Sequence, residues 1–169
     1  MKVIVQPSTE PITVAQAKAW LRVDYDTDDS LIEVLITAAR TKAEHHTNRA
    51  FIEQTISEVT AAESELRLSV GDVLAIVSVT VEGETLDPAL YELKEDELGA
   101  LVEFDTEPLY PPTIVYTAGY GPDIDDVPKA IVQAMLLAIA EMYENRTDRL
   151  QRLPTASYHL LNTVRRWVT

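Results

Sequence analysis

The chain has 169 residues, of which 46% are hydrophobic and 25% charged, with five Gly, nine Pro and no Cys. This composition excludes disordered, collagen-like and disulfide-dense chains, and the length suffices for about one domain with its own core. Because Cys is absent, a disulfide framework, a thiolate metal site and a cysteine nucleophile are excluded as well.

The formal net charge is -14, and it is distributed unevenly along the chain. From Arg146 onward the chain contains five Arg residues and one acid, Asp148. This tail therefore carries a net charge of +4, and residues 1–145 carry -18. A surface this acidic repels phosphate, so we expect it not to grip duplex DNA. The basic tail suits an anionic partner, although Arg side chains are also favoured near helix C-termini on electrostatic grounds alone.

The sequence indicates neither a signal peptide nor a membrane helix. Val3 to Val5 are three consecutive apolar residues, whereas a signal peptide needs about 7 to 15. The longest apolar run, Ala134 to Ala140, has seven residues, whereas a membrane helix needs about 20. We therefore expect no secretion by that route and no membrane partner.

Cap signals and apolar periodicity predict two helices in the first part of the chain. Thr13 and Gln16 have the spacing of a capping box, which predicts a helix over about 13–22. Ser30 and Glu33 repeat the signature before a second helix over about 30–47, with Asn48 as a left-handed stop. The polar face of this second helix is expected to hold Glu33, Thr37, Arg40 and Glu44.

Two more helices are predicted after the middle of the chain. Asp125, Asp126 and Pro128 are typical of a helix start, and the third helix is expected over about 127–146. This helix has almost no polar face, which predicts burial in the core or in a subunit interface. Thr155 is suited to cap a last helix over about 156–167.

The residues between these helices alternate with period two and carry turn signals about every ten positions. They predict a β insertion over about 52–118, with strands near 52–60, 65–70, 75–82, 90–94, 100–104 and 112–118. We therefore predict one α+β domain over residues 1–169. Helices from both chain ends form a bundle, and an antiparallel β region is inserted between the second and third helices.

No candidate catalytic or metal-binding motif in the sequence has the residue spacing that its chemistry requires. Asp24, Asp26 and Asp28 resemble the start of a calcium loop, but Asp29 and Leu35 stand where Gly and Glu are needed. The adjacent His45 and His46 point about 100 degrees apart on a helix, which does not suit one metal ion, and His159 lies far along the chain. We predict no enzyme, and no catalytic, metal-binding or cofactor-binding residues. A small metal-dependent hydrolase is the less favoured alternative.

Two groups of residues resemble the head-tail connector (adaptor) proteins of tailed phages. The first comprises Pro11 to Asp24 (PITVAQAKAWLRVD) and Asp29 to Arg40 (DSLIEVLITAAR), followed by Thr47-Asn48-Arg49-Ala50 and Gln54-Thr55. The second comprises Ala118-Gly119-Tyr120-Gly121, Val127-Pro128, Ala130-Ile131 and Tyr143-Glu144-Asn145-Arg146. The resemblance runs in the same order over about 11–146, and it departs from the family at Asn48, where Gly is more usual.

The resemblance implies a non-enzymatic subunit of the virion neck that is made in the cytoplasm of a bacterial host. It implies a ring, usually of twelve copies, which lies under the portal protein and extends the DNA channel toward the next neck or tail protein. DNA passes through this channel without specific binding. Another neck or tail-completion role remains the alternative. The family's use of a C-terminal segment for docking makes Arg149, Arg152, Arg165, Arg166 and Trp167 the candidate portal-contact residues.

Overall fold

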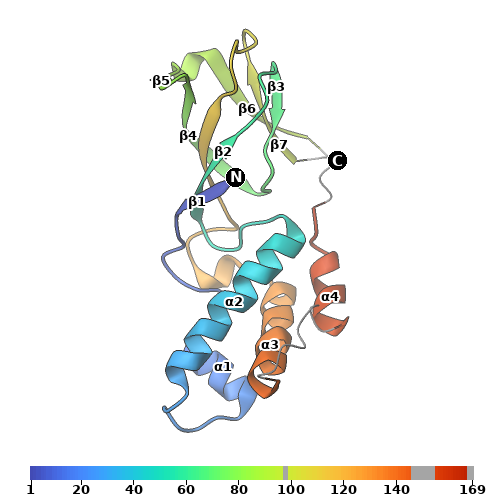
Figure 1. Cartoon of the computed structure of the whole chain (residues 1–169). Helices are drawn as coiled ribbons and strands as arrows, with labels where there is room; N and C mark the ends of the chain where they lie inside the picture. Colours follow the sequence, from blue (N-terminus) through green and yellow to red (C-terminus); the bar gives the residue numbers. More distant parts are fainter. Residues whose placement is uncertain (97–98, 146–154, 167–169) are drawn as a thin grey trace. The chain divides into compact units, whose positions relative to one another are not determined.

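The computed structural model describes residues 1–96, 99–145 and 155–166, and Figure 1 shows their course. The fold is α+β, as predicted, with four α-helices and two antiparallel sheets in this part of the chain. The elements form two compact units. The β unit comprises Met1–Ser8, Asn48–Pro122 and, at the end of the described chain, Arg166, whereas the helical unit comprises Thr9–Thr47 and the described residues of Asp123–Arg165.

The helical unit contains α1 (Val14–Leu21), α2 (Asp29–Thr47), α3 (Lys129–Glu144) and α4 (Thr155–Asn162). Helix α3 contacts the other three helices, and Ile131, Met135 and Ile139 are fully buried along it. This position explains why the sequence of α3 has almost no polar face. No helix in the described ranges is both long and apolar enough to cross a membrane.

Local capping signals set the ends of these helices. The backbone N–H of Gln16 donates to Thr13 Oγ1 at 3.2 Å, and the N–H of Thr13 donates to Gln16 Oε1 at 2.9 Å, which confirms the capping box. Asn48 follows α2 with a φ of 54°, as predicted for a left-handed stop. Helix α4 ends at Asn162, earlier than predicted, because the next two amides turn back to the carbonyls of Leu160 and Leu161.

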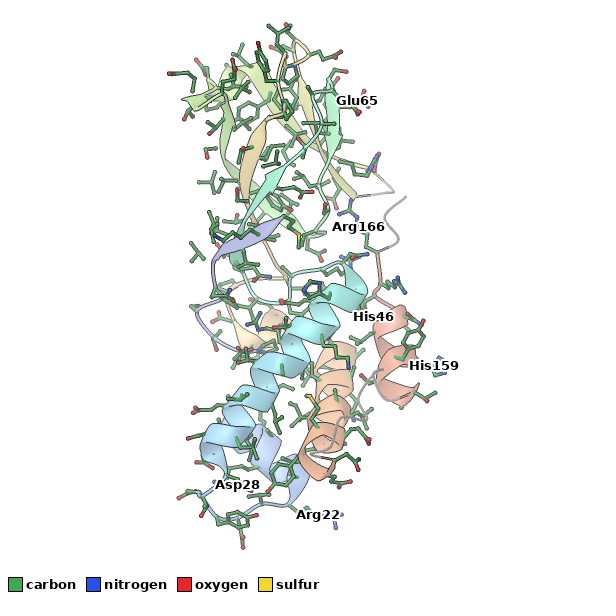
Figure 2. All side chains as sticks on the ribbon, viewed as in Figure 1. Arg22, Asp28, His46, Glu65, His159 and Arg166 are labelled. Carbon is green, nitrogen blue, oxygen red and sulfur yellow. The ribbon has the colours of Figure 1, made fainter. Side chains whose placement is uncertain are left out.

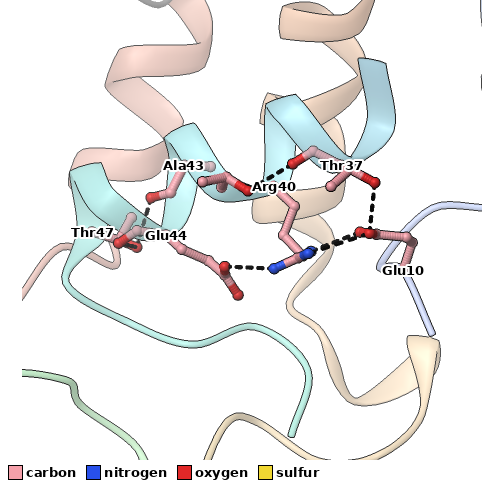
Figure 3. Close-up of polar contacts among 7 residues, drawn as sticks. Glu10, Thr37, Arg40, Ala43, Glu44 and Thr47 are labelled. Atoms are coloured by element: carbon pink, nitrogen blue, oxygen red, sulfur yellow. Dashed lines mark hydrogen bonds and ion pairs between the residues drawn. The ribbon is translucent and has the colours of Figure 1, made fainter. Parts of the chain in front are cut away.

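A buried ion network on α2 corrects one expectation from the periodicity. Arg40 was expected on a polar face, but it is buried in the structure. Its Nε lies 2.7 Å from Glu10 Oε2 and its Nη1 lies 2.9 Å from Glu44 Oε2, and Thr37 Oγ1 donates to Glu10 Oε1 at 2.9 Å (Figure 3). Burial alone would lower the pKa of Arg40, but the two carboxylates outweigh it and raise that pKa. The segment that carries Glu10 covers this side of α2, which local periodicity does not reveal.

The described residues of the β unit form eight strands in two sheets. The first sheet has the order β1-β2-β8-β4-β5 and the second has the order β3-β7-β6. All paired strands are antiparallel, as predicted. The strands are β1 (Lys2–Val5), β2 (Gln54–Val59), β3 (Glu65–Arg67), β4 (Val73–Val81), β5 (Glu84–Thr85), β6 (Tyr91–Asp96), β7 (Gly99–Phe104) and β8 (Thr113–Ala118).

Strand β1 was not predicted. Lys2–Val5 is too short to give a local signal, and only its pairing with β2, such as Val3 with Ile56, places it in the sheet. The two sheets share one core, in which Ile56, Ile114 and Tyr116 from the first sheet join Leu66, Val102 and Phe104 from the second.

A buried carboxylate lies inside this β core. Tyr116 donates its hydroxyl to Glu58 Oε2 at 2.9 Å, and the backbone N–H and the hydroxyl of Ser69 also donate to Glu58. Burial, followed by the nearby charge of Glu58, raises the pKa of Tyr116, so its hydroxyl remains a donor at physiological pH. The three donors together satisfy a carboxylate that would otherwise be costly to bury.

We expect Tyr116→Phe to lower the free energy of unfolding by about 1–3 kcal/mol, because the Glu58 carboxylate then loses a donor while it stays buried. Urea denaturation followed by circular dichroism measures this loss. An unchanged free energy of unfolding would show that the hydrogen bond contributes nothing net to stability.

Candidate functional site

The predicted portal-contact residues fall at the end of the chain. Arg149, Arg152 and Trp167 lie outside the described residues. Arg165 is half-buried. Arg166 is only 7% exposed and is the last residue described (Figure 2).

Arg166 is fixed in the β unit by its backbone and its side chain. Its carbonyl accepts a hydrogen bond of 3.0 Å from Asn48 Nδ2. Its guanidinium lies against Gly99, where an added Cβ would come within 2.6 Å of three of its atoms, and its Cδ lies near Gly71. Gly99 has a φ of 112°, so both the backbone conformation and the approach of Arg166 favour glycine there.

Two more arginines are held near Arg166 by carboxylates. Arg49 Nη1 lies 2.5 Å from Asp72 Oδ2, and Arg67 makes two bonds of 2.7 Å to the carboxylate oxygens of Asp96. Burial lowers the pKa of Arg166, and the positive charges of Arg67 and Arg49 lower it further. The three guanidinium groups form a basic cluster in a chain of strongly negative net charge.

Within this cluster, Arg166 has a structural role in the β unit. In the chain by itself its side chain is packed away from solvent, so it ties the end of the described chain to the strands. Contact of this residue with a portal remains a prediction. Sequence reasoning recognised the basic tail but not Arg49 and Arg67, because their approach to Arg166 depends on long-range folding.

An open apolar groove of about 380 Å³ lies elsewhere on the β unit. Backbone hydrogen bonds fix its frame, since Asp105 N donates to Leu90 O and Leu86 N donates to Val79 O. Leu109 stands at its rim with 89% of its surface exposed. The groove is lined by Val81, Glu82, Leu86, Leu90, Phe104, Asp105, Thr106, Pro108, Leu109 and Tyr110.

One feature of the sequence indicates this groove, although apolar periodicity does not reveal it. The turn before β8 reads Pro108-Leu109-Tyr110-Pro111-Pro112, and it places large apolar side chains in a loop where polar residues are usual. An exposed apolar surface of this kind is typical of a contact with another protein. The groove is therefore a candidate docking surface on the β unit.

Two of the three acids that resembled a calcium loop, Asp26 and Asp28, are engaged by side chains of the helical unit, as is the neighbouring Asp29. Lys18 Nζ lies 2.6 Å from Asp26 Oδ1 and 2.7 Å from Asp29 Oδ1. The hydroxyl of Tyr143 donates to Asp28 Oδ2 at 2.5 Å. These contacts give the acids a role in joining the start of α2 to α1 and α3.

The histidines do not form a metal centre. His46 Nε2 lies 2.9 Å from Asn162 Oδ1, and its ring packs 4.7 Å from that of Tyr158. His45 is exposed on α2, and His159 is exposed on α4, on the side that faces away from α2 (Figure 2). Within residues 1–96, 99–145 and 155–166, no three His, Asp or Glu side chains are grouped to hold a metal ion.

Comparison with known proteins gives a family match over part of the chain and a shared fold. Residues 11–87 match the model of the phage gp6-like head-tail connector protein family. No curated protein matches the chain significantly. The family match covers the first group of residues that carried the resemblance, from Pro11 to Thr55.

Several solved structures of gene transfer agent (GTA) particles contain a chain of the same fold. A chain in the neck of an empty GTA particle, computed with C6 symmetry, has a TM-score of 0.81 at 20% identity, over 100% of this chain and 97% of that chain. A chain in the virion of a native GTA particle has a TM-score of 0.83 at 19% identity, over 99% and 96%. A chain in the neck of a native particle, computed with C12 symmetry, has a TM-score of 0.76 at 18% identity, over 100% and 97%.

The family match and the shared fold support a non-enzymatic structural protein, as the sequence predicted. The resemblance stated from the residues is confirmed by the family match over residues 11–87. Residues 11–87 of this chain thus match the phage gp6-like head-tail connector family, and the whole chain shares its fold with chains of GTA particles.

Proposed function

We propose that this chain is a structural connector subunit in the neck of a phage-like particle, at the junction of head and tail. The observation that carries the proposal is the likeness of the whole chain to chains from particle necks, together with the connector family match over residues 11–87. The role is one of assembly, and it requires no catalytic centre.

The proposed assembly is a ring of identical subunits. Two of the similar neck structures were computed with C6 and C12 symmetry, which supports a cyclic arrangement here. The proposed partners are the portal protein on one side and the next neck or tail protein on the other. A net charge of -14 suits a channel through which DNA slides without binding.

The two compact units are proposed to act as one connector domain. In this arrangement the helices from both chain ends form a bundle, and the strands between α2 and α3 are the inserted β region. Strand β1 and Arg166 add both ends of the described chain to the β unit. The proposed portal-contact residues are Arg149, Arg152, Arg165, Arg166 and Trp167.

Co-sedimentation with the purified portal oligomer of the same particle tests the proposal. The full chain is expected to sediment with the portal in a fixed stoichiometry at near-physiological salt. A full chain that stays in the supernatant would overturn portal docking and favour the tail-completion role.

The tail assignment is tested in the same assay with Arg149→Ala/Arg152→Ala. Point substitutions are preferable to truncation because α4 packs against α3, so deletion from residue 149 would also expose the helical core. We expect the double variant to bind about tenfold more weakly or worse, as for the loss of two charged contacts. Lys129→Ala, which removes an exposed cation of the helical unit, is the matched control and should bind normally. Equal binding by both variants would contradict the tail assignment.

A further inference from the structure

The five-stranded sheet has an open edge at β1 and another along the part of β4 that the two-residue strand β5 does not cover. Strand β1 pairs only with β2 among the described strands. Strand β4 pairs with β8 along one edge, whereas β5 and Leu86 cover its other edge only from Val79 to Val81. Within the described chain, the outer edge of β4 from Val73 to Ser78 therefore has no neighbouring strand.

The two sheets differ in how their edges are protected. Charged side chains on an edge strand discourage pairing with another chain. The edge strands of the second sheet carry many charges, namely Glu65, Arg67, Glu92, Lys94, Glu95 and Asp96. By contrast, β4 (VLAIVSVTV) has no charged residue in nine, and β1 has only Lys2. The open edges of the first sheet thus carry far fewer charges than those of the second sheet.

The open edges of the first sheet also expose apolar side chains. On β4, Leu74 is 48% exposed and Val77 is 59% exposed, each beside an irregularity in the register with β8. On β1, Ile4 and Val5 are likewise exposed. An open backbone edge with exposed apolar side chains is suited to strand addition, in which backbone hydrogen bonds supply affinity and side chains supply specificity.

A cyclic ring needs two different, complementary surfaces on each subunit, because every contact joins one face of a copy to the other face of its neighbour. The ends of this sheet provide such a pair. We propose, on the basis of the ring described under Proposed function, that β1 of one copy pairs with the open edge of β4 in the adjacent copy. The joined sheets then continue from subunit to subunit.

The direction of this pairing follows from the sheet order. Neighbouring strands alternate in direction from β1 through β2 and β8 to β4, so β1 and β4 run in opposite directions. When the next copy repeats this orientation, its β1 lies antiparallel to β4. The four residues of β1 also fit within the open segment from Val73 to Ser78.

Cysteine crosslinking tests the contact directly, since the natural chain has no Cys. We expect Ile4→Cys/Val77→Cys, treated with a short bismaleimide, to give a ladder of covalent oligomers in the presence of the portal oligomer. The matched control is Ile4→Cys/Glu92→Cys, which places the second thiol on the charged edge strand β6 and should give no ladder. Portal-bound copies that give no Ile4–Val77 ladder would overturn the edge contact and leave the neck role intact.

A charge substitution tests the same contact without chemical modification. We expect Val77→Lys to weaken assembly of copies on the portal about tenfold or more, because an ammonium group must then be buried against an apolar edge. Val34→Lys on α2 is the matched control, since Val34 is 65% exposed, and it should assemble normally. Normal assembly of Val77→Lys would overturn the proposal. If the unmodified chain also fails to bind the portal, the proposed function itself fails.

Discussion

Gly119→Ala is expected to lower the free energy of unfolding by about 2–5 kcal/mol, the sum of backbone strain and overpacking. Gly119 has a φ of 148°, and an added Cβ would lie 2.6 Å from Glu53 N and 2.7 Å from the carbonyl carbon of Ile52. Those atoms are backbone, which cannot rotate away as the end of a side chain can. The substitution therefore forces two segments of the β unit apart.

The segments in question are joined by backbone hydrogen bonds. Glu53 N donates to Gly121 O at 2.9 Å, and Gly119 N donates to Asp72 O at 2.9 Å. A shift at Gly119 disturbs these bonds together, which is why the expected loss exceeds that of an ordinary turn substitution. This close approach gives a physical reason for glycine in the Ala118-Gly119-Tyr120-Gly121 segment that resembles the connector family.

The matched control for this prediction is Gly83→Ala. Gly83 also has a positive φ, 88°, but an added Cβ there would meet nothing within 4 Å. Only backbone strain remains, so we expect a loss of about 1–2 kcal/mol. Chemical denaturation of both variants measures the difference. Equal losses would show that the approach of residues 52 and 53 adds nothing to the cost at Gly119.

Arg40→Ala is expected to destabilise the protein by about 3–5 kcal/mol, as for the loss of one partner from a buried ion pair. Arg40 is bound on one side by Glu10 and on the other by Glu44 (Figure 3). Without the guanidinium, these two carboxylates repel each other across a poorly solvated space. The loss also frees the segment around Glu10 from α2.

A double-mutant cycle separates this network from simple loss of packing. Because Glu10→Ala removes a charge that Arg40 neutralises, the effects of Arg40→Ala and Glu10→Ala should be strongly non-additive. The exposed pair Lys129–Asp125 provides the control, since Lys129→Ala should cost at most about 0.5 kcal/mol. Additive effects of the Arg40 and Glu10 substitutions would contradict the proposed coupling.

The family resemblance and the local sequence signals predicted many of the secondary-structure elements and the proposed function. The capping box at Thr13, the stop at Asn48 and the β-branched alternation of residues 52–118 each follow from interactions within a few residues. These interactions join residues that are close together in the sequence, so the sequence itself reveals them. The apolar composition of α3 predicted its burial because a helix that is apolar on nearly every face is packed on nearly every face.

The candidate surfaces were less accessible to sequence reasoning. Leu109 and Tyr110 are simply apolar residues in a loop until folding places them at the rim of a groove. The sequence placed Arg166 only in a basic tail, and the structure shows that it packs beside Gly99 and near Arg49 and Arg67. In both cases the environment of the side chain depends on residues far away in the sequence.

The sequence alone thus determined the types and order of the main elements, the acidic character of the chain and its resemblance to head-tail connectors. Only the tertiary structure decided that β1 joins the sheet, that Arg40 is buried between Glu10 and Glu44, and which strands end as open edges. The reason is physical. Caps and periodicity arise from neighbours along the chain, whereas strand order, burial of a charge and an unpaired edge arise from contacts that only the folded chain brings together.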